Sequence, residues 1–172
     1  MSHDIFRNRR DLGAIPDLSS LLAPSHSRYV PFGSRNANEN FESGNLSRWT
    51  LSTTGANNFA LQSIYTHGGT YAARSGALLD NQMCTMTMNV VGPTKVSWWW
   101  MVNSETNYDF LQYLIDGVVQ TTKISGTVGW TQVTGVVIPS GAHTLGFRYS
   151  KDVSVSVGLD AGMIDDIVFL DS

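Results

Sequence analysis

Apolar and polar residues alternate along most of the chain after residue 40, which is the pattern of half-buried β-strands. Residues 94–102 place bulky groups on both sides of one strand: Val96, Trp98, Trp100 and Val102 on the first, and Ser97, Trp99 and Met101 on the second. Large side chains on both sides predict a central strand, either covered on both faces or lining a groove on one.

Turn signals separate the apolar runs. Asp116-Gly117 joins two β-rich runs at residues 110–115 and 118–122, and an Asp-Gly pair in this position predicts a tight hairpin because both turn residues need a positive φ. Further strand signals lie at residues 49–51, 59–64, 71–74, 83–90, 130–138 and 143–149. About ten short strands without a convincing long helix predict an all-β sandwich or barrel.

Residues 1–40 differ from the rest, because they are polar and contain three of the five prolines. Asp17 can cap one short helix there, but the segment has too few apolar residues to order itself. We therefore predict an extended N-terminal arm over residues 1–40 and a sandwich over 41–172. The alternatives for the arm are a floppy tail, docking on its own sandwich, or docking on a neighbouring subunit. The predicted docking residues are Arg7, Arg9, Arg10, Leu18, Leu21, Leu22, Tyr29 and Phe32.

Charge and composition exclude several classes of protein. The formal net charge is −3, so the basic face typical of a nucleic-acid-binding protein is not expected. No apolar run is long enough to span a membrane. Cys84 is the only cysteine, which excludes an internal disulfide. Arg9-Arg10 lies before a segment broken by Asp and Pro residues, so we predict no signal peptide.

Motifs along residues 41–172 resemble those of bacterial jelly-roll modules related to MAM and concanavalin-like sandwiches. The matching residues are Phe41-Glu42-Ser43-Gly44, Trp49, Ser75-Gly76, Asp109, Ile115-Asp116-Gly117, Trp130, Gly141-x-His143-Thr144-Leu145, Tyr149-x-Lys151-Asp152, Gly158-x-Asp160 and Ile164-Asp165-Asp166. Such modules occur as accessory domains of secreted enzymes and surface proteins. The resemblance implies a two-sheet antiparallel jelly roll.

The same resemblance implies a structural cation, commonly calcium. Glu42 begins the sandwich and Asp166 ends it, and terminal strands of a jelly roll can lie side by side, so the predicted oxygen ligands are Glu42, Asp160 and Asp166. The alternative is that Asp160 and Asp165 make turn and cap hydrogen bonds while Glu42 pairs with Arg48 or Lys151.

Catalytic motifs are absent from the sequence, so we predict that the protein is not an enzyme. His67 and His143 are isolated. The carboxylate pairs Glu105 with Asp109 and Asp165 with Asp166 are formal candidates for glycoside hydrolysis. Adjacent strand residues point to opposite faces, which argues against the second pair.

Aromatic residues give a candidate binding surface. Trp99 with Tyr108 or Tyr113 can form a stacking platform for sugar rings. Trp98 and Trp100 are expected in the core, and for Trp99 both core and surface remain open.

Three functions follow from these features. The first is given by resemblance, because a free-standing jelly roll behind an arm is similar to a virion component. It is a structural virion protein, a phage capsid decoration or tail-associated protein made in the host cytoplasm, whose arm binds capsid or tail subunits and neighbouring copies of itself. The alternative is a calcium-dependent carbohydrate-binding module with a glycan partner. A glycan-cleaving enzyme is the third.

Overall fold

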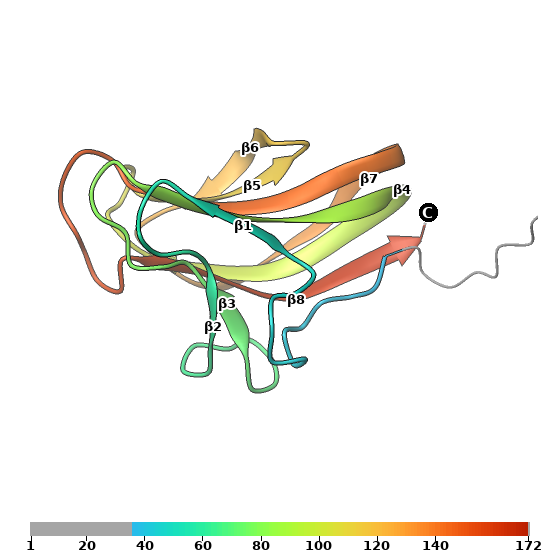
Figure 1. The fold of residues 1–172 in the computed structure, drawn as a ribbon, viewed down its shortest axis with the longest axis horizontal. Coiled ribbons are helices and arrows are strands. Elements are labelled where there is room, and N and C mark those ends of the chain that lie inside the picture. Colours follow the sequence, from blue (N-terminus) through green and yellow to red (C-terminus); the bar gives the residue numbers. More distant parts are fainter. Residues whose placement is uncertain (1–35, 172) are drawn as a thin grey trace, which may run out of the picture. The chain divides into compact units, whose positions relative to one another are not determined.

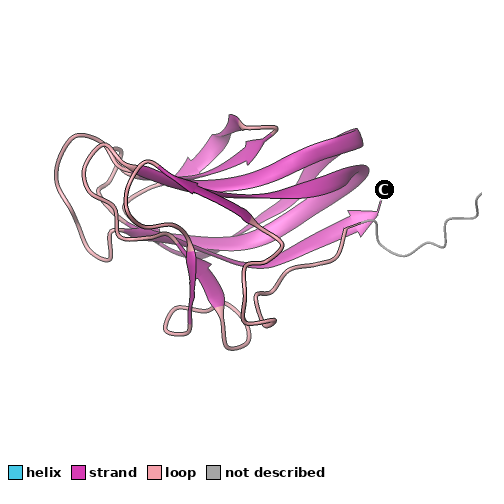
Figure 2. Ribbon diagram, in the orientation of Figure 1, coloured by secondary structure: helices cyan, strands magenta, loops and turns pink. Residues whose placement is uncertain are grey.

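The computed structural model describes residues 36–171, which form an antiparallel sandwich of strands without helices (Figures 1 and 2). The strands are β1 (Thr50–Thr53), β2 (Ala60–Gln62), β3 (Ala72–Arg74), β4 (Met83–Asn103), β5 (Phe110–Ile115), β6 (Val118–Ile124), β7 (Thr127–Ser150) and β8 (Ala161–Asp171). Within this range, no helix is long and apolar enough to cross a membrane. The predicted arm residues Arg7, Arg9, Arg10, Leu18, Leu21, Leu22, Tyr29 and Phe32 lie outside the described residues.

Two long strands, β4 and β7, run through both layers of the sandwich. Their ladder pairs Met83 with Ser150 at one end and Asn103 with Thr127 at the other, and its register shifts between Gly92 and Thr94. At this shift the ladder bends from one layer into the other (Figure 1). Sequence patterns suggested separate strands on each side of the bend. The structure joins them, so eight strands replace the expected ten or so.

Gly92 is needed at the bend. A Cβ atom at this position would lie 1.6 Å from the carbonyl oxygen of Pro139, so a side chain would force the two long strands apart. The close approach keeps the two layers connected by a continuous ladder.

The bend separates the hydrogen-bonded strand pairs into two layers. In one layer, β1 and β7 flank the first half of β4, and β5 and β6 extend the sheet beyond β7. In the other layer, the second half of β4 lies between β7 and β8, and β3 and β2 follow beyond β8. Glu39 pairs with Ile167 of β8, so the chain just before the sandwich runs along its last strand.

The core lies between the layers and is rich in aromatic residues. Trp98 and Trp100 of β4 are buried, as their alternation predicted, and the Trp98 ring packs edge-on against Phe147 with centroids 5.2 Å apart. The Asp116-Gly117 turn is confirmed as well. Ile115 pairs with Val118, and both turn residues have a positive φ, 52° and 77°.

Candidate functional site

Three aromatic rings meet on the outer face of the layer that contains β8. Trp99 points outward from β4, and the ring of His67 stacks on it with centroids 3.9 Å apart and an interplanar angle of 14°. Trp130 of β7 meets the same histidine edge-on, with centroids 5.8 Å apart. We call His67, Trp99 and Trp130 the aromatic patch. Both tryptophans are partly exposed.

Asp165 of β8 holds the loop that carries His67 against the sheet. Its Oδ2 atom accepts hydrogen bonds from the backbone N–H groups of His67 at 2.9 Å and Gly68 at 3.1 Å. Its Oδ1 atom accepts from the backbone N–H of Asp166 at 2.8 Å. The Asp165 side chain is fully buried beneath this loop, and burial raises the pKa of its carboxyl group, although the backbone donors oppose the rise.

Asp166 contacts the same loop because the strand is irregular at this point. Asp166 has a φ of 47°, and the β4–β8 register shifts opposite it, between Ser97 and Trp99. Its Oδ2 atom lies 2.7 Å from Nδ1 of His67. The expectation that Asp165 and Asp166 point to opposite faces was therefore wrong, because the bulge breaks the strand alternation.

Glu42 fixes the far end of the loop. Its Oε1 atom accepts hydrogen bonds from the backbone N–H groups of Thr70 and Tyr71, each at 2.8 Å. The Tyr71 and Thr70 donors hold the pKa of Glu42 below its ordinary value. Gly69 lies against the Glu42 carboxylate and has a φ of 59°, a backbone conformation that favours glycine. We call Glu42, Asp165 and Asp166 the loop clamp.

A shallow depression of about 380 Å³ lies at the ends of the strands that carry the two tryptophans. Met101 and Gly129, close neighbours of Trp99 and Trp130 in sequence, line it together with Tyr65 and the polar Asn103. The depression adds a further exposed ring, Tyr65, two residues before His67 in the chain.

The structure separates the three residues predicted to stack on a sugar. Trp99 lies on the outer face, whereas Tyr113 packs against the core tryptophan Trp98 with ring centroids 4.9 Å apart. Tyr108 is exposed on the loop between β4 and β5. His67 and Trp130 take the places expected for the tyrosines. The position of Trp130 in its strand could have indicated that its side chain points outward. No sequence pattern indicated that the loop with His67 lies against this sheet.

The predicted calcium ligands are separated too. Glu42 and Asp166 border the loop at residues 67–71, while Asp160 accepts a hydrogen bond from the Tyr149 hydroxyl at 2.8 Å and another from Lys151. Asp160 therefore belongs to a different set of charges. The alternative ion pairs for Glu42 also differ from the structure, because Arg48 pairs with Glu39 at 3.3 Å.

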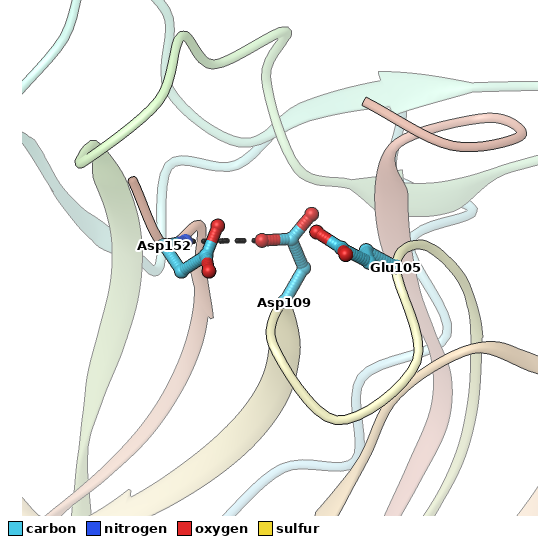
Figure 3. Close-up of side chains that lie close together, drawn as sticks. All are labelled: Glu105, Asp109 and Asp152. Atoms are coloured by element: carbon cyan, nitrogen blue, oxygen red, sulfur yellow. Dashed lines mark hydrogen bonds between the residues drawn. The ribbon is translucent and has the colours of Figure 1, made fainter. Parts of the chain in front are cut away.

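A second group of carboxylates lies where the β4–β5 and β7–β8 loops meet. Glu105, Asp109 and Asp152 each offer an oxygen, and these oxygens lie within 4.8 Å of one another (Figure 3). We call these three residues the acidic cluster. Burial, followed by repulsion from Asp152 and Asp109, raises the pKa of Glu105. Burial also raises the pKa of Asp109.

Comparisons with known proteins show the fold. No protein-family model matches the sequence, and no curated protein matches it either. Among solved structures, TmCBM61 in complex with β-1,4-galactotriose aligns with a TM-score of 0.57 and 16% identity, over 81% of this chain and 99% of that one. The K3 cleaved adhesin domain of Lys-gingipain from Porphyromonas gingivalis gives 0.59 and 14%, over 78% and 98%.

A third similar structure is the CBM22-1 xylan-binding domain of Xyn10C from Paenibacillus barcinonensis. It aligns with a TM-score of 0.51 and 14% identity, over 79% of this chain and 94% of that one. At these identities the likeness defines the class of fold. The chain has a two-layer antiparallel β-sandwich of the kind found in carbohydrate-binding modules, and the expected jelly-roll sandwich is confirmed.

Proposed function

We propose that this protein is a non-catalytic carbohydrate-binding module that holds a glycan against the aromatic patch. The observation that carries the proposal is the contact between His67, Trp99 and Trp130 on one outer face of the sandwich. The similar structures support it, since TmCBM61 was solved with β-1,4-galactotriose and CBM22-1 is a xylan-binding domain.

The chemistry of the patch suits a sugar. Aromatic rings offer a rigid apolar surface with a polar edge, which matches a pyranose ring that has C–H groups on its faces and hydroxyls around its rim. The loop clamp fixes His67 through backbone and side-chain hydrogen bonds, so little conformational freedom remains to be lost on binding. Tyr65 is partly exposed in the neighbouring depression, so its hydroxyl can contact the sugar hydroxyls.

The positions of the carboxylates support a binding role over hydrolysis. Asp165 and Asp109 are both fully buried, so neither candidate pair presents two carboxylates to a substrate. A glycosidase needs an acid and a second carboxylate flanking the scissile bond.

Virion attachment through the arm stays a separate prediction. Its docking residues lie within residues 1–35, outside the described part of the chain. The similar sandwiches favour the carbohydrate-binding alternative.

The test is a glycan array that includes β-1,4-galactan and xylan oligosaccharides, probed with the full chain. We expect binding to at least one glycan. Trp130→Ala should weaken this binding about tenfold or more, because it removes one ring of the aromatic patch. A tenfold change corresponds to about 1.4 kcal/mol of binding free energy. Tyr108→Ala is the matched control, since it removes an exposed ring from the loop between β4 and β5, outside the aromatic patch, and it should bind as the wild type does. An array without any bound glycan, or full binding by Trp130→Ala, would contradict the proposal.

A further inference from the structure

The acidic cluster contains carboxylate oxygens that receive no hydrogen bond. The side chain of Asp109 is fully buried, and its Oδ2 atom has no hydrogen-bond partner. Oε2 of Glu105 is likewise buried without a partner. Figure 3 shows the Glu105 and Asp109 carboxylates facing each other. An unsatisfied buried oxygen costs free energy, and two of them side by side on carboxylates indicate a missing positive charge.

Lys151 lies close by but supplies this charge only in part, because it forms an ion pair with Asp109 and no hydrogen bond to the cluster. Its Nζ atom is 3.7 Å from Oδ2 of Asp109, beyond hydrogen-bond range. A lysine ammonium has three protons to donate. Those of Lys151 go to Asp160, to Oγ of Ser156 at 2.8 Å and to the carbonyl oxygen of Val155 at 3.3 Å.

Negative charge is also in excess around this point. The carboxylates of Asp80 and Asp160 pair with Lys151 as well, so this one ammonium faces them together with the three carboxylates of the acidic cluster. The negative charge that Lys151 leaves uncompensated can be neutralised by protons or by a bound cation.

The loops that carry the cluster are already fixed in place. Oδ1 of Asp109 accepts the backbone N–H of Asp152 at 3.0 Å, the dashed contact in Figure 3. The Ser104 hydroxyl donates to the Asp109 carbonyl at 3.0 Å. Glu105 and Asp152 are partly exposed, so an ion can enter from solvent and keep water ligands on that side.

We infer that Glu105, Asp109 and Asp152 bind a calcium ion that joins the β4–β5 loop to the β7–β8 loop. All three side chains offer hard oxygen ligands, and calcium accepts six to eight oxygens in irregular geometry, including loop carbonyls and water. Magnesium requires near-ideal octahedral geometry, and zinc sites are built mainly on histidine or cysteine side chains, which the cluster lacks. This site is distinct from the one predicted at Glu42, Asp160 and Asp166, and it does not depend on the proposed glycan binding.

The experiment is a calorimetric titration of calcium chloride into the full chain after treatment with a chelator. We expect one calcium ion to bind, and the affinity to fall at least tenfold in Glu105→Gln and in Asp152→Asn. Glu42→Gln is the matched control, because it removes a carboxylate charge from the other predicted site and should leave the affinity unchanged. Thermal denaturation of the same proteins should show a calcium-dependent rise in melting temperature only where calcium binds.

Each outcome decides the inference. It is overturned if the wild type binds no calcium. It is also overturned if Glu105→Gln and Asp152→Asn bind calcium as the wild type does, or if Glu42→Gln alone abolishes binding. Equal affinity for magnesium chloride would overturn the assignment to calcium.

Discussion

The loop clamp and the acidic cluster are both groups of three carboxylates, but they differ in the donors around them. In the clamp, Glu42 and Asp165 accept backbone N–H groups and Asp166 contacts His67. In the cluster, Oε2 of Glu105 and Oδ2 of Asp109 accept no hydrogen bond.

The difference shows how one kind of side chain takes two roles. Where the chain supplies its own donors, carboxylates fix a loop, and here they set the His67 ring on Trp99. Where donors are missing, the same groups can take an external cation, as we propose for the acidic cluster. The donors around each carboxylate, and not the number of acidic residues, separate a structural contact from a binding site.

The largest effect is expected at Lys151, the buried ammonium beside the acidic cluster. Lys151→Met leaves several carboxylates without their cation, so the free energy of unfolding should fall by about 3–5 kcal/mol. Lys95→Met, at an exposed position of β4, is the control and should change it by less than about 0.5 kcal/mol. Urea denaturation measures both, and an equal small change in the two would show that the charges around Lys151 are already neutralised.

A smaller loss is expected at the loop clamp. Asp165→Asn replaces one of the two acceptor oxygens by an NH2 group, so the side chain can no longer accept both the loop N–H groups and the N–H of Asp166. The free energy of unfolding should fall by about 1–3 kcal/mol. Asp166→Asn keeps an acceptor for His67 and should cost less, about 0–1 kcal/mol. The clamp would not hold the loop as described if Asp166→Asn destabilised the protein more than Asp165→Asn.

The smallest effect is on pH dependence. The pKa of Glu42 is lowered in the folded state, so its contribution to stability is present above the unfolded pKa, about 4.3, and is lost as the pH falls through the folded value. Glu42→Gln should therefore make the protein lose less stability as the pH falls.

The pKa of Glu105 is raised in the folded state, so ionising Glu105 lowers stability as the pH rises. Glu105→Gln should remove this loss. Urea midpoints between pH 2 and pH 7 measure both slopes, and equal slopes would contradict the contrast.

Local patterns predicted most of the fold. Alternation placed Trp98 and Trp100 inside, and the Asp116-Gly117 pair fixed a hairpin. These features depend on near neighbours in the chain, so sequence carries them directly. The bend that joins strands into β4 and β7 depends on a close approach of Gly92 to Pro139, which no local pattern reveals.

The candidate site was predicted less completely. Trp99 was identified as a surface candidate, but His67 reaches it only through contacts with Asp165 and Asp166, nearly a hundred residues away. The positive φ of Asp166 is unusual for a non-glycine residue within a strand. The regular alternation of a strand therefore predicted the wrong sheet face for the Asp166 side chain. Glu105 and Asp109 were paired from the sequence as a formal catalytic candidate, but nothing indicated that Asp152, more than forty residues later, would join them.

The central claim is that the aromatic patch binds a glycan, and the five tryptophans provide a direct test. Trp49, Trp98 and Trp100 are buried in the core, whereas Trp99 and Trp130 belong to the patch. Indole N–H signals in a ¹⁵N-labelled sample can be followed while an oligosaccharide that binds on the array is added. The signals of Trp99 and Trp130 should shift with the glycan while those of the three core tryptophans stay in place. Binding that leaves both patch signals unmoved would contradict the account.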